Sequence, residues 1–311
     1  MELRAYAKIN LSLDVLGRRE DGYHNISSLM QDIGLYDVIT VEKCSKSGTK
    51  YNAPHCKLFN VVVYLCTNDR TIPVGEDNLA IKGAKAILAA MDKDGINHQI
   101  EELVINIDKK LPVAAGIAGG SGNAAATMLG INAIAGYPYS MRELMAMSAS
   151  VGADVPYSLM MNSKKNSKAL ALMQGIDEAS NAAMMSGIGD IVEPTSSIYR
   201  HIIMANPGIS VSTKSAYEAI DDIKDYSSES GLFTNQLEKY TLANYAEARE
   251  LKDAMSEHLD AEVVLMSGSG PTMVAYYTDQ NKAKTDYEDM VVSDWFRRNW
   301  RAWLTETGSP D

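Results

Sequence analysis

The chain has 311 residues, of which 46% are hydrophobic and 22% are charged, and its formal net charge is -11. This composition is that of a folded protein with one large or two medium domains, and it excludes a disordered chain. The acidic excess gives no overall attraction to nucleic acid or to anionic lipid, so neither is expected as a partner.

The cysteines and the N-terminal segment restrict the class of protein further. Cys44, Cys56 and Cys66 are an odd number without metal-ligand spacing, so neither a disulfide framework nor a zinc site is expected. No apolar run approaches the ~20 residues of a membrane span, and the first residues lack a leader pattern. We therefore expect a cytoplasmic protein that folds alone.

The first half of the chain predicts a strand hairpin followed by helices and strands. Apolar and polar residues alternate over residues 3–16, which predicts a half-buried strand. A turn at 18–22 leads to a second strand that ends at 38–41. The next elements, in chain order, are a helix over 77–95 with Asp77 as N-cap and Gly95 as terminator, a strand at 102–107, a glycine-rich loop, and a helix over 123–135.

The second half gives an α+β order rather than strict alternation of strand and helix. Ser140 and Glu143 form a capping box, which predicts a helix that ends before Gly152. The remaining elements are a strand at 202–205, a helix over 236–259, and strands at 263–266 and 272–277. The polar segment 162–168 breaks the apolar pattern, so we expect one domain over 1–162 and a second over 163–311.

The strongest signal of chemistry is the segment 111–126, LPVAAGIAGGSGNAAA, which lies between a predicted strand and a predicted helix. Its glycines at 119, 120 and 122 let the backbone approach a ligand, and the helix N-terminus favours an anion such as a polyphosphate. A tight turn would explain the glycines equally well. The P-loop and Rossmann strings are both absent, so those two nucleotide-binding folds are excluded.

Five strings in the same order along the chain resemble the GHMP kinases. The segment 111–126 resembles their phosphate-binding motif. The other four are YAKINLSL from Tyr6 to Leu13, DGYH from Asp21 to His24, GADVP from Gly152 to Pro156, and MSGSGPT from Met266 to Thr272. The DGYH string resembles the corresponding string of one branch of this family, in which the substrate that accepts the phosphoryl group is 4-diphosphocytidyl-2-C-methyl-D-erythritol.

The resemblance implies an α+β fold with two domains, a ribosomal-protein-S5-like N-terminal domain and a ferredoxin-like C-terminal domain, with the active site in the cleft between them. It implies phosphorylation of the 2-hydroxyl of this acceptor in non-mevalonate isoprenoid biosynthesis, with ATP and Mg²⁺ as cofactors. No side chains are expected to form a dedicated metal site. The expected partner is the small-molecule substrate, without nucleic acid or membrane, and the protein is expected to be a monomer or weak homodimer.

The resemblance also implies roles for individual residues. Asp154 is the candidate proton acceptor, and Lys8 is the cation that holds it ionised; without the resemblance, Asp154 would be interpreted as a cap or turn residue and Lys8 as solvent-exposed. The expected ATP-binding residues are Pro112, Ala114, Ala115, Gly116, Ile117, Ala118, Gly119, Gly120, Ser121, Gly122 and Asn123.

The expected substrate-binding residues are Asn10, Tyr23, His24, Thr213, Tyr217, Gly268, Ser269 and Gly270. Tyr23 and His24 resemble the cytidine-recognition pair of the family, one stacking on the base and the other bonding its edge. Tyr217 is expected on the other face of the base. The loop 268–270 is expected to close the phosphate site, although a β-turn would explain it too.

Three departures from the family pattern leave alternatives open. Gly122 replaces the second serine of the phosphate motif, and the segment 157–190 is altered, so a catalytically silent binding protein on the same fold is one alternative, against which the intact Lys8 and Asp154 argue. Another GHMP kinase, acting on mevalonate, homoserine or a sugar, is the second alternative. The tail 295–311 holds all three tryptophans and is expected to pack on the core or to form a contact surface.

Overall fold

A computed structural model describes residues 1–44, 53–223, 226 and 231–308, with the side chains of 222 and 223 excepted. The described residues form two compact units. Unit 1 is built from Met1–Ala7, Leu35–Val113 and Ala118–Asn181, and unit 2 from Lys8–Gly34, Ala114–Ile117 and Ala182–Asp311. The domain boundary expected at residue 162 stays a prediction.

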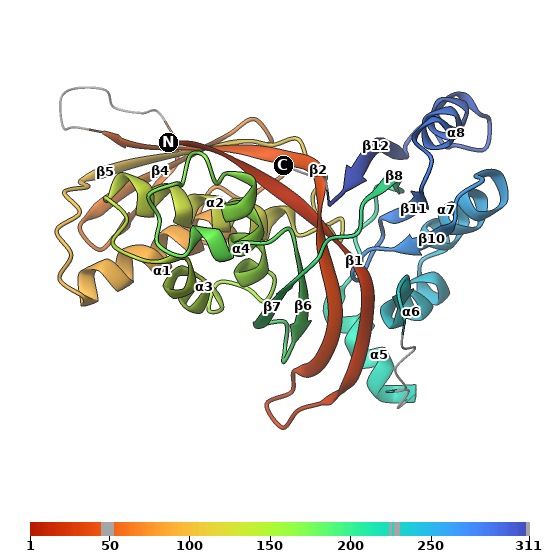
Figure 1. Ribbon diagram of the computed structural model, residues 1–311, viewed down its shortest axis with the longest axis horizontal. Coiled ribbons are helices and arrows are strands. Elements are labelled where there is room, and N and C mark those ends of the chain that lie inside the picture. Colours follow the sequence, from red (N-terminus) through yellow and green to blue (C-terminus); the bar gives the residue numbers. More distant parts are fainter. Residues whose placement is uncertain (45–52, 224–225, 227–230, 309–311) are drawn as a thin grey trace. The chain divides into compact units, whose positions relative to one another are not determined.

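The predicted N-terminal hairpin is confirmed. Strands β1 (Glu2–Arg18) and β2 (His24–Cys44) pair with each other, and the turn between them is visible at the end of the long ribbon in Figure 1. The half-exposure predicted from the alternation is wrong, because every residue from Ala5 to Val15 is buried. The side chains of Lys8, Asn10 and Ser12 are hydrogen-bonded to one another or to β2; for example, Ser12 Oγ accepts from Leu29 N at 3.0 Å.

Unit 1 has a sheet and a layer of helices. Strand β2 pairs antiparallel with β5, β5 pairs parallel with β4, and β4 pairs antiparallel with β3. The helices lie on one face of this sheet (Figure 1). The elements are β3 (His55–Leu58), β4 (Val61–Thr67), α1 (Leu79–Lys93), β5 (Glu102–Asp108), α2 (Gly119–Ile134), α3 (Met141–Ser148), α4 (Val155–Lys165) and the short 3-10 helix Ile176–Glu178.

The helix boundaries of unit 1 correct two predictions and confirm one. The N-cap of α1 is Asn78, whose side chain accepts from Ala80 N, rather than Asp77. Helix α2 begins at Gly119 instead of 123, because packing of buried glycines overrides their low helix propensity. The capping box at the start of α3 is confirmed in both directions. Helix α4, which covers the start of the polar segment 162–168, was not predicted.

Unit 2 has an antiparallel sheet in the order β10-β11-β8-β12-β2, with helices α7 and α8 packed against it. Strand β6 adds to another part of β2, with β7 beside it, and β9 pairs parallel with β1. The elements are β6 (Ala182–Ser186), β7 (Ile191–Thr195), β8 (Arg200–Asn206), α5 (Thr213–Ile223), β9 (Thr234–Asn235), α6 (Gln236–Asn244), α7 (Ala246–His258), β10 (Val263–Met266), β11 (Met273–Tyr277), α8 (Gln280–Val292) and β12 (Arg301–Thr307).

The single helix predicted over 236–259 is wrong, because the chain forms two helices. Tyr245 separates α6 from α7 and has the extended angles φ -124° and ψ 98°. Neither α5 nor α8 was predicted. The strands predicted in this half are found within one or two residues of their expected positions.

The tryptophan-rich tail packs on the core of unit 2, which was one of its two expected roles. Strand β12 pairs antiparallel with β8 over the whole of both strands, from Arg301↔Asn206 to Thr307↔Arg200. Trp300 precedes this strand, is 5% exposed, and belongs to the apolar core of the unit. The tail therefore contributes both a strand and a core side chain.

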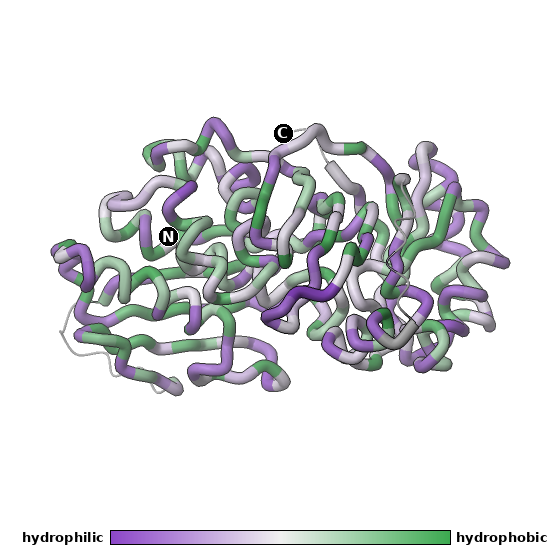
Figure 2. Tube along the Cα trace, turned by 90° about the horizontal axis from the view of Figure 1, so that it is seen from below, coloured by the Kyte–Doolittle hydropathy of each residue, from purple (hydrophilic) through white to green (hydrophobic). Residues whose placement is uncertain are grey.

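Hydrophobic and hydrophilic residues alternate in short stretches along most of the chain (Figure 2). Among the described residues, no helix has both the length and the apolar character needed to cross a membrane.

Trp300→Ala is expected to lower the free energy of unfolding by about 3 to 5 kcal/mol, because it removes a large buried side chain and leaves a cavity. Urea unfolding followed by far-ultraviolet circular dichroism measures the loss. Val292→Ala is the control, since Val292 is 81% exposed and a surface change costs about 0.5 kcal/mol or less. Equal losses in the two variants would show that the tail does not support the core.

Candidate active site

Lys8 and Asn10 form a buried polar pair on β1. Lys8 Nζ donates to Asn10 Oδ1 at 2.8 Å, and Asn10 Nδ2 donates to Ser28 Oγ at 2.8 Å. Lys8 is 3% exposed and Asn10 is 1% exposed. Burying an ammonium group costs free energy unless polar partners compensate for it, so this placement is unusual for a purely structural lysine. The exposed position considered for Lys8 is wrong.

The glycine-rich loop contains strained backbone. Ala114 has φ 52° and Ala118 has φ 55°, which are left-handed values that residues other than glycine seldom adopt, and Gly116 has φ 73°. Each such non-glycine residue costs about 1 to 3 kcal/mol, and these conformations occur most often at ligand sites. A loop formed only as a simple turn would not need two strained alanines.

The N-terminus of α2 has the features of an anion site. No side chain caps it, and its first turn contains no acidic residue. The Nζ atom of Lys109 lies 3.4 Å from the position that a Cβ atom on Gly119 would occupy. The backbone N–H groups of the first turn, the helix dipole and this ammonium group together favour the binding of an anion such as a phosphate at the start of α2.

Lys109 is itself held by a buried ion pair. Its Nζ atom lies 2.8 Å from Asp37 Oδ2, and the two side chains are 5% and 0% exposed. The other oxygen of Asp37 accepts from the backbone N–H groups of Lys110 and Leu111 at 2.7 and 2.8 Å. Asp37 therefore fixes the start of the loop. Sequence analysis missed this pair, because its members are far apart in the chain and belong to no motif.

Asn123 contributes a further polar atom to this loop. Its Oδ1 atom is buried and has no hydrogen-bond partner among the described residues. Buried polar atoms are nearly always paired with protein or water, so an unpaired one often marks a ligand site. Among the other predicted ATP-binding residues, Gly120 is exposed, Pro112 and Ser121 are half-buried, and Ala115 and Ile117 are buried.

Gly122 allows a close approach between α2 and β1. A Cβ atom at this position would lie 2.9 Å from the carbonyl oxygen of Tyr6. Real Cβ atoms do not approach backbone so closely, so a side chain here requires the helix or the strand to move. The structure thus gives this glycine a packing role, and the effect of the missing serine on activity stays a prediction.

The loop 267–270 lies against Gly116 and Asn10 within unit 2. Ser267 Oγ donates to Gly116 O at 3.1 Å, and a Cβ atom on Gly268 would lie 3.0 Å from the same oxygen. The position of that Cβ atom is also 3.6 Å from Asn10 Oδ1. The structure thus brings together residues of three of the predicted strings.

Three side chains outside the predicted strings hold this loop. Asn235 Nδ2 donates to the carbonyl oxygens of Met266 and Gly268, at 2.7 and 2.8 Å. Thr241 Oγ1 donates to Ser269 O at 3.0 Å, and Thr213 Oγ1 lies 2.8 Å from Ser269 Oγ. Thr213 was predicted, whereas Asn235 and Thr241 were missed because nothing in the local sequence marks them.

The predicted base-binding residues are only partly brought together. The rings of His24 and Tyr217 are stacked, with centroids 5.1 Å apart and planes 26° apart. Tyr23 is 62% exposed. The Nε2 atom of His24 lies 2.7 Å from Asp221 Oδ1, a contact that sequence analysis missed although Asp221 is one helical turn after Tyr217.

Asp154 lies at the N-cap position of α4 but does not cap the helix with its side chain. It has helical angles, φ -82° and ψ -7°, and is half-buried. Asp154 therefore occupies the turn before the helix, as the alternative of a cap or turn residue expects, but makes no side-chain capping bond.

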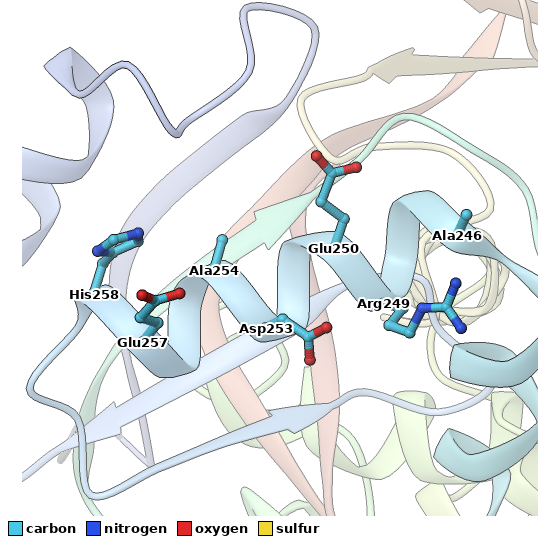
Figure 3. A pocket seen from close by; sticks show the side chains of 7 residues that line it. All are labelled: Ala246, Arg249, Glu250, Asp253, Ala254, Glu257 and His258. Carbon is cyan, nitrogen blue, oxygen red and sulfur yellow. The ribbon is translucent and has the colours of Figure 1, made fainter.

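A surface hollow of about 400 Å³ lies along α7, away from every predicted site residue in sequence. Its side chains project from one helix in several directions (Figure 3). The lining residues are Ala246, Arg249, Glu250, Asp253, Ala254, Glu257 and His258. These charged side chains are typical of a solvated helix face. Within the part of the chain that the structure describes, no cluster of three or more His, Cys, Asp or Glu side chains could hold a metal ion.

Two family models match the chain. The model described as GHMP kinases N terminal domain matches residues 78–162, and the model described as GHMP kinases C terminal matches residues 212–292. The first match includes the glycine-rich loop and Asp154. The second includes Thr213, Tyr217 and the loop 268–270.

Similar proteins extend the match to nearly the full chain. The 4-diphosphocytidyl-2-C-methyl-D-erythritol kinase of Alkaliphilus metalliredigens (strain QYMF) is 34% identical, over 96% of this chain and 98% of its own length. The kinase of that name from Thermoanaerobacter pseudethanolicus (strain ATCC 33223 / 39E) is 32% identical, over 93% and 92%. A crystal structure of 4-(cytidine 5'-diphospho)-2C-methyl-D-erythritol kinase is 26% identical, with a TM-score of 0.72 over 100% of both chains.

Gly122→Ala and Gly122→Ser are both expected to lower the free energy of unfolding by about 1 to 3 kcal/mol, because the new Cβ atom overpacks against Tyr6 O. Urea unfolding measures the change. Gly120→Ala is the matched control in the same helical turn. Its Cβ atom would meet a flexible leucine side chain at 3.1 Å, so a smaller loss is expected. A Gly122→Ser variant as stable as the parent would show that β1 and α2 adjust freely.

Proposed function

Because the chain belongs to the GHMP kinase family, we propose that it transfers the γ-phosphoryl group of ATP to the 2-hydroxyl of 4-diphosphocytidyl-2-C-methyl-D-erythritol, a step of non-mevalonate isoprenoid biosynthesis. The observation that carries this proposal is the similarity over nearly the whole chain to relatives named for this substrate. The stacked rings of His24 and Tyr217 support it, since an acceptor without a nucleobase needs no aromatic site.

The residues of the glycine-rich loop are proposed to bind the phosphates of ATP. Phosphoryl transfer depends chiefly on positioning and on compensating the charge of the phosphates. The uncapped N–H groups at Gly119 and Gly120, with the ammonium group of Lys109, supply such compensation without any serine at position 122. The loop 268–270 and Asn10 are proposed to contact the acceptor.

Asp154 is proposed to accept the proton of the acceptor hydroxyl as that oxygen attacks the γ-phosphorus. It lies at the N-cap position of α4, within the GADVP string that resembles the family's catalytic segment. Lys8, oriented by Asn10, supplies a fixed positive charge for the developing negative charge.

Mg²⁺ would shield the negative charge of the nucleotide phosphates when bound. Protein sites for this ion usually offer only one or two carboxylates, and the phosphates supply other ligands. Asp154, which is half-buried at the start of α4, would supply one such carboxylate. A monomeric or weakly dimeric state, a cytoplasmic location and the absence of nucleic-acid and membrane partners stay predictions.

Release of ADP by the purified protein tests the proposal, with the diphosphocytidyl acceptor, mevalonate, homoserine and galactose offered in parallel. We expect turnover with the first acceptor and at least 100-fold less with the others, because binding energy from the nucleobase is lost when the base is missing. Turnover with mevalonate or homoserine would replace the proposed acceptor. Binding of ATP without turnover of any acceptor would favour a silent protein.

Asp154→Asn is expected to lower kcat by roughly 10²- to 10⁴-fold, because it removes the proton acceptor while changing little volume. Affinity for ATP, measured by calorimetry, is expected to stay within about twofold of the parent. Asp177→Asn is the control, since Asp177 is an exposed aspartate of the same unit. Near-normal kcat in the Asp154 variant would remove this residue from the mechanism.

A further inference from the structure

Asp221 and His24 form a contact that no predicted string contains. His24 Nε2 lies 2.7 Å from Asp221 Oδ1, and the two side chains are 8% and 15% exposed. The contact joins β2 to α5 within unit 2, across 197 residues of sequence. A hydrogen bond this short between two mostly buried groups fixes the histidine ring.

The contact determines which ring nitrogen of His24 carries the proton. An ionised carboxylate only accepts hydrogen bonds, so Nε2 must be the protonated nitrogen. In the neutral imidazole, Nδ1 is then left with a lone pair and acts as an acceptor. When the ring is neutral, it therefore presents an acceptor, and not a donor, to any ligand that meets Nδ1.

Asp221 is itself held in place by groups on two other segments. Tyr226 Oη donates to Asp221 Oδ1 at 2.8 Å, and Arg18 Nη1 lies 3.2 Å from Oδ2. Burial acts to raise the pKa of Asp221, but the hydrogen bonds from His24 and Tyr226 and the charge of Arg18 outweigh it, so the pKa is lowered. The carboxylate is thus ionised at neutral pH.

Tyr217 and Asp221 act on the same ring from one helix. They are separated by four residues on α5, which places their side chains on the same face. Tyr217 stacks on the face of the imidazole while Asp221 bonds its edge. Both the plane and the tautomer of His24 are therefore set by a single helical turn.

We propose that Asp221 is a positioning residue that makes the base site selective for a pyrimidine with an exocyclic amino group. The inference rests on the proposed function and on the base-edge role that the family resemblance implies for His24. Cytosine offers an N4 amino donor, which pairs with an Nδ1 acceptor; a 4-keto pyrimidine such as uracil offers an acceptor at this position. Two facing acceptors leave both groups unpaired, and a polar site rejects such a ligand strongly.

The tautomer can be measured on the wild-type protein without any substrate. A two-bond proton–nitrogen correlation spectrum reports which nitrogen of each histidine is protonated, and a His24→Gln variant assigns the signal of His24 among the five histidines. We expect a proton on Nε2 alone. A proton on Nδ1, with or without one on Nε2, would overturn the inference.

Substrate selectivity is measured with the cytidine acceptor and its uridine counterpart. We expect Asp221→Asn to reduce the ratio of kcat/KM for cytidine over uridine by about 10- to 100-fold, the worth of one hydrogen bond to a charged group. Most of the change is expected in KM for the cytidine acceptor, with KM for ATP unchanged. Glu218→Gln is the matched control, because it removes an exposed carboxylate from the same helix.

The outcomes separate this inference from the proposed function. If the wild type phosphorylates the cytidine acceptor and Asp221→Asn keeps the full preference for cytidine, the role of Asp221 is wrong and the proposed function stands. If the wild type phosphorylates neither nucleotide acceptor, the proposed function fails and the base preference fails with it. Tyr226→Phe, which removes a hydrogen bond to Asp221 but leaves the carboxylate, is expected to lower the ratio less than Asp221→Asn does.

Discussion

The close approach of backbone to backbone around the glycine-rich loop constrains everything else in the candidate site. In unit 1, Gly122 allows α2 to lie against the carbonyl group of Tyr6. In unit 2, Gly116 allows the backbone of the loop 267–270 to lie close to its own backbone. A Cβ atom at Gly116 would lie 2.4 Å from Ser267 O. Neither contact tolerates a side chain, and within unit 1 the packing of α2 against β1 sets the position of this helix before any ligand binds.

One cluster of buried polar groups accompanies this packing in each unit. Lys8, Asn10 and Ser28 form one hydrogen-bonded chain, and Asp37 with Lys109 forms a second cluster. Such groups contribute little to net stability, because the cost of removing them from water offsets much of their attraction. Their value is geometric, since each has one arrangement that satisfies its partners. A site built this way holds its charges ready and need not reorganise when charge develops.

Local sequence patterns predicted many of the elements and the motifs. Contacts between residues distant in the sequence determined the features that these patterns did not predict. The hairpin, the capping box of α3 and the strands around the loop 268–270 followed from periodicity and turn residues. The burial of both faces of β1 did not, because alternation cannot reveal that polar residues are bonded to a neighbouring strand. Asp37 and Asn235 were invisible for the same reason: their partners are distant in sequence, and only the folded chain brings them together.

The position of β12 has a consequence for the synthesis of the chain. This strand, the last that the structure describes, lies between β8 and β2 in the sheet of unit 2. While the ribosome adds the roughly 100 residues that separate β8 from β12, a process of about 5 to 20 seconds at typical elongation rates, one edge of β8 has no native partner. An unpaired edge invites pairing with other nascent chains. The sheet of unit 2 therefore depends on residues 301–307 to join β8 to β2.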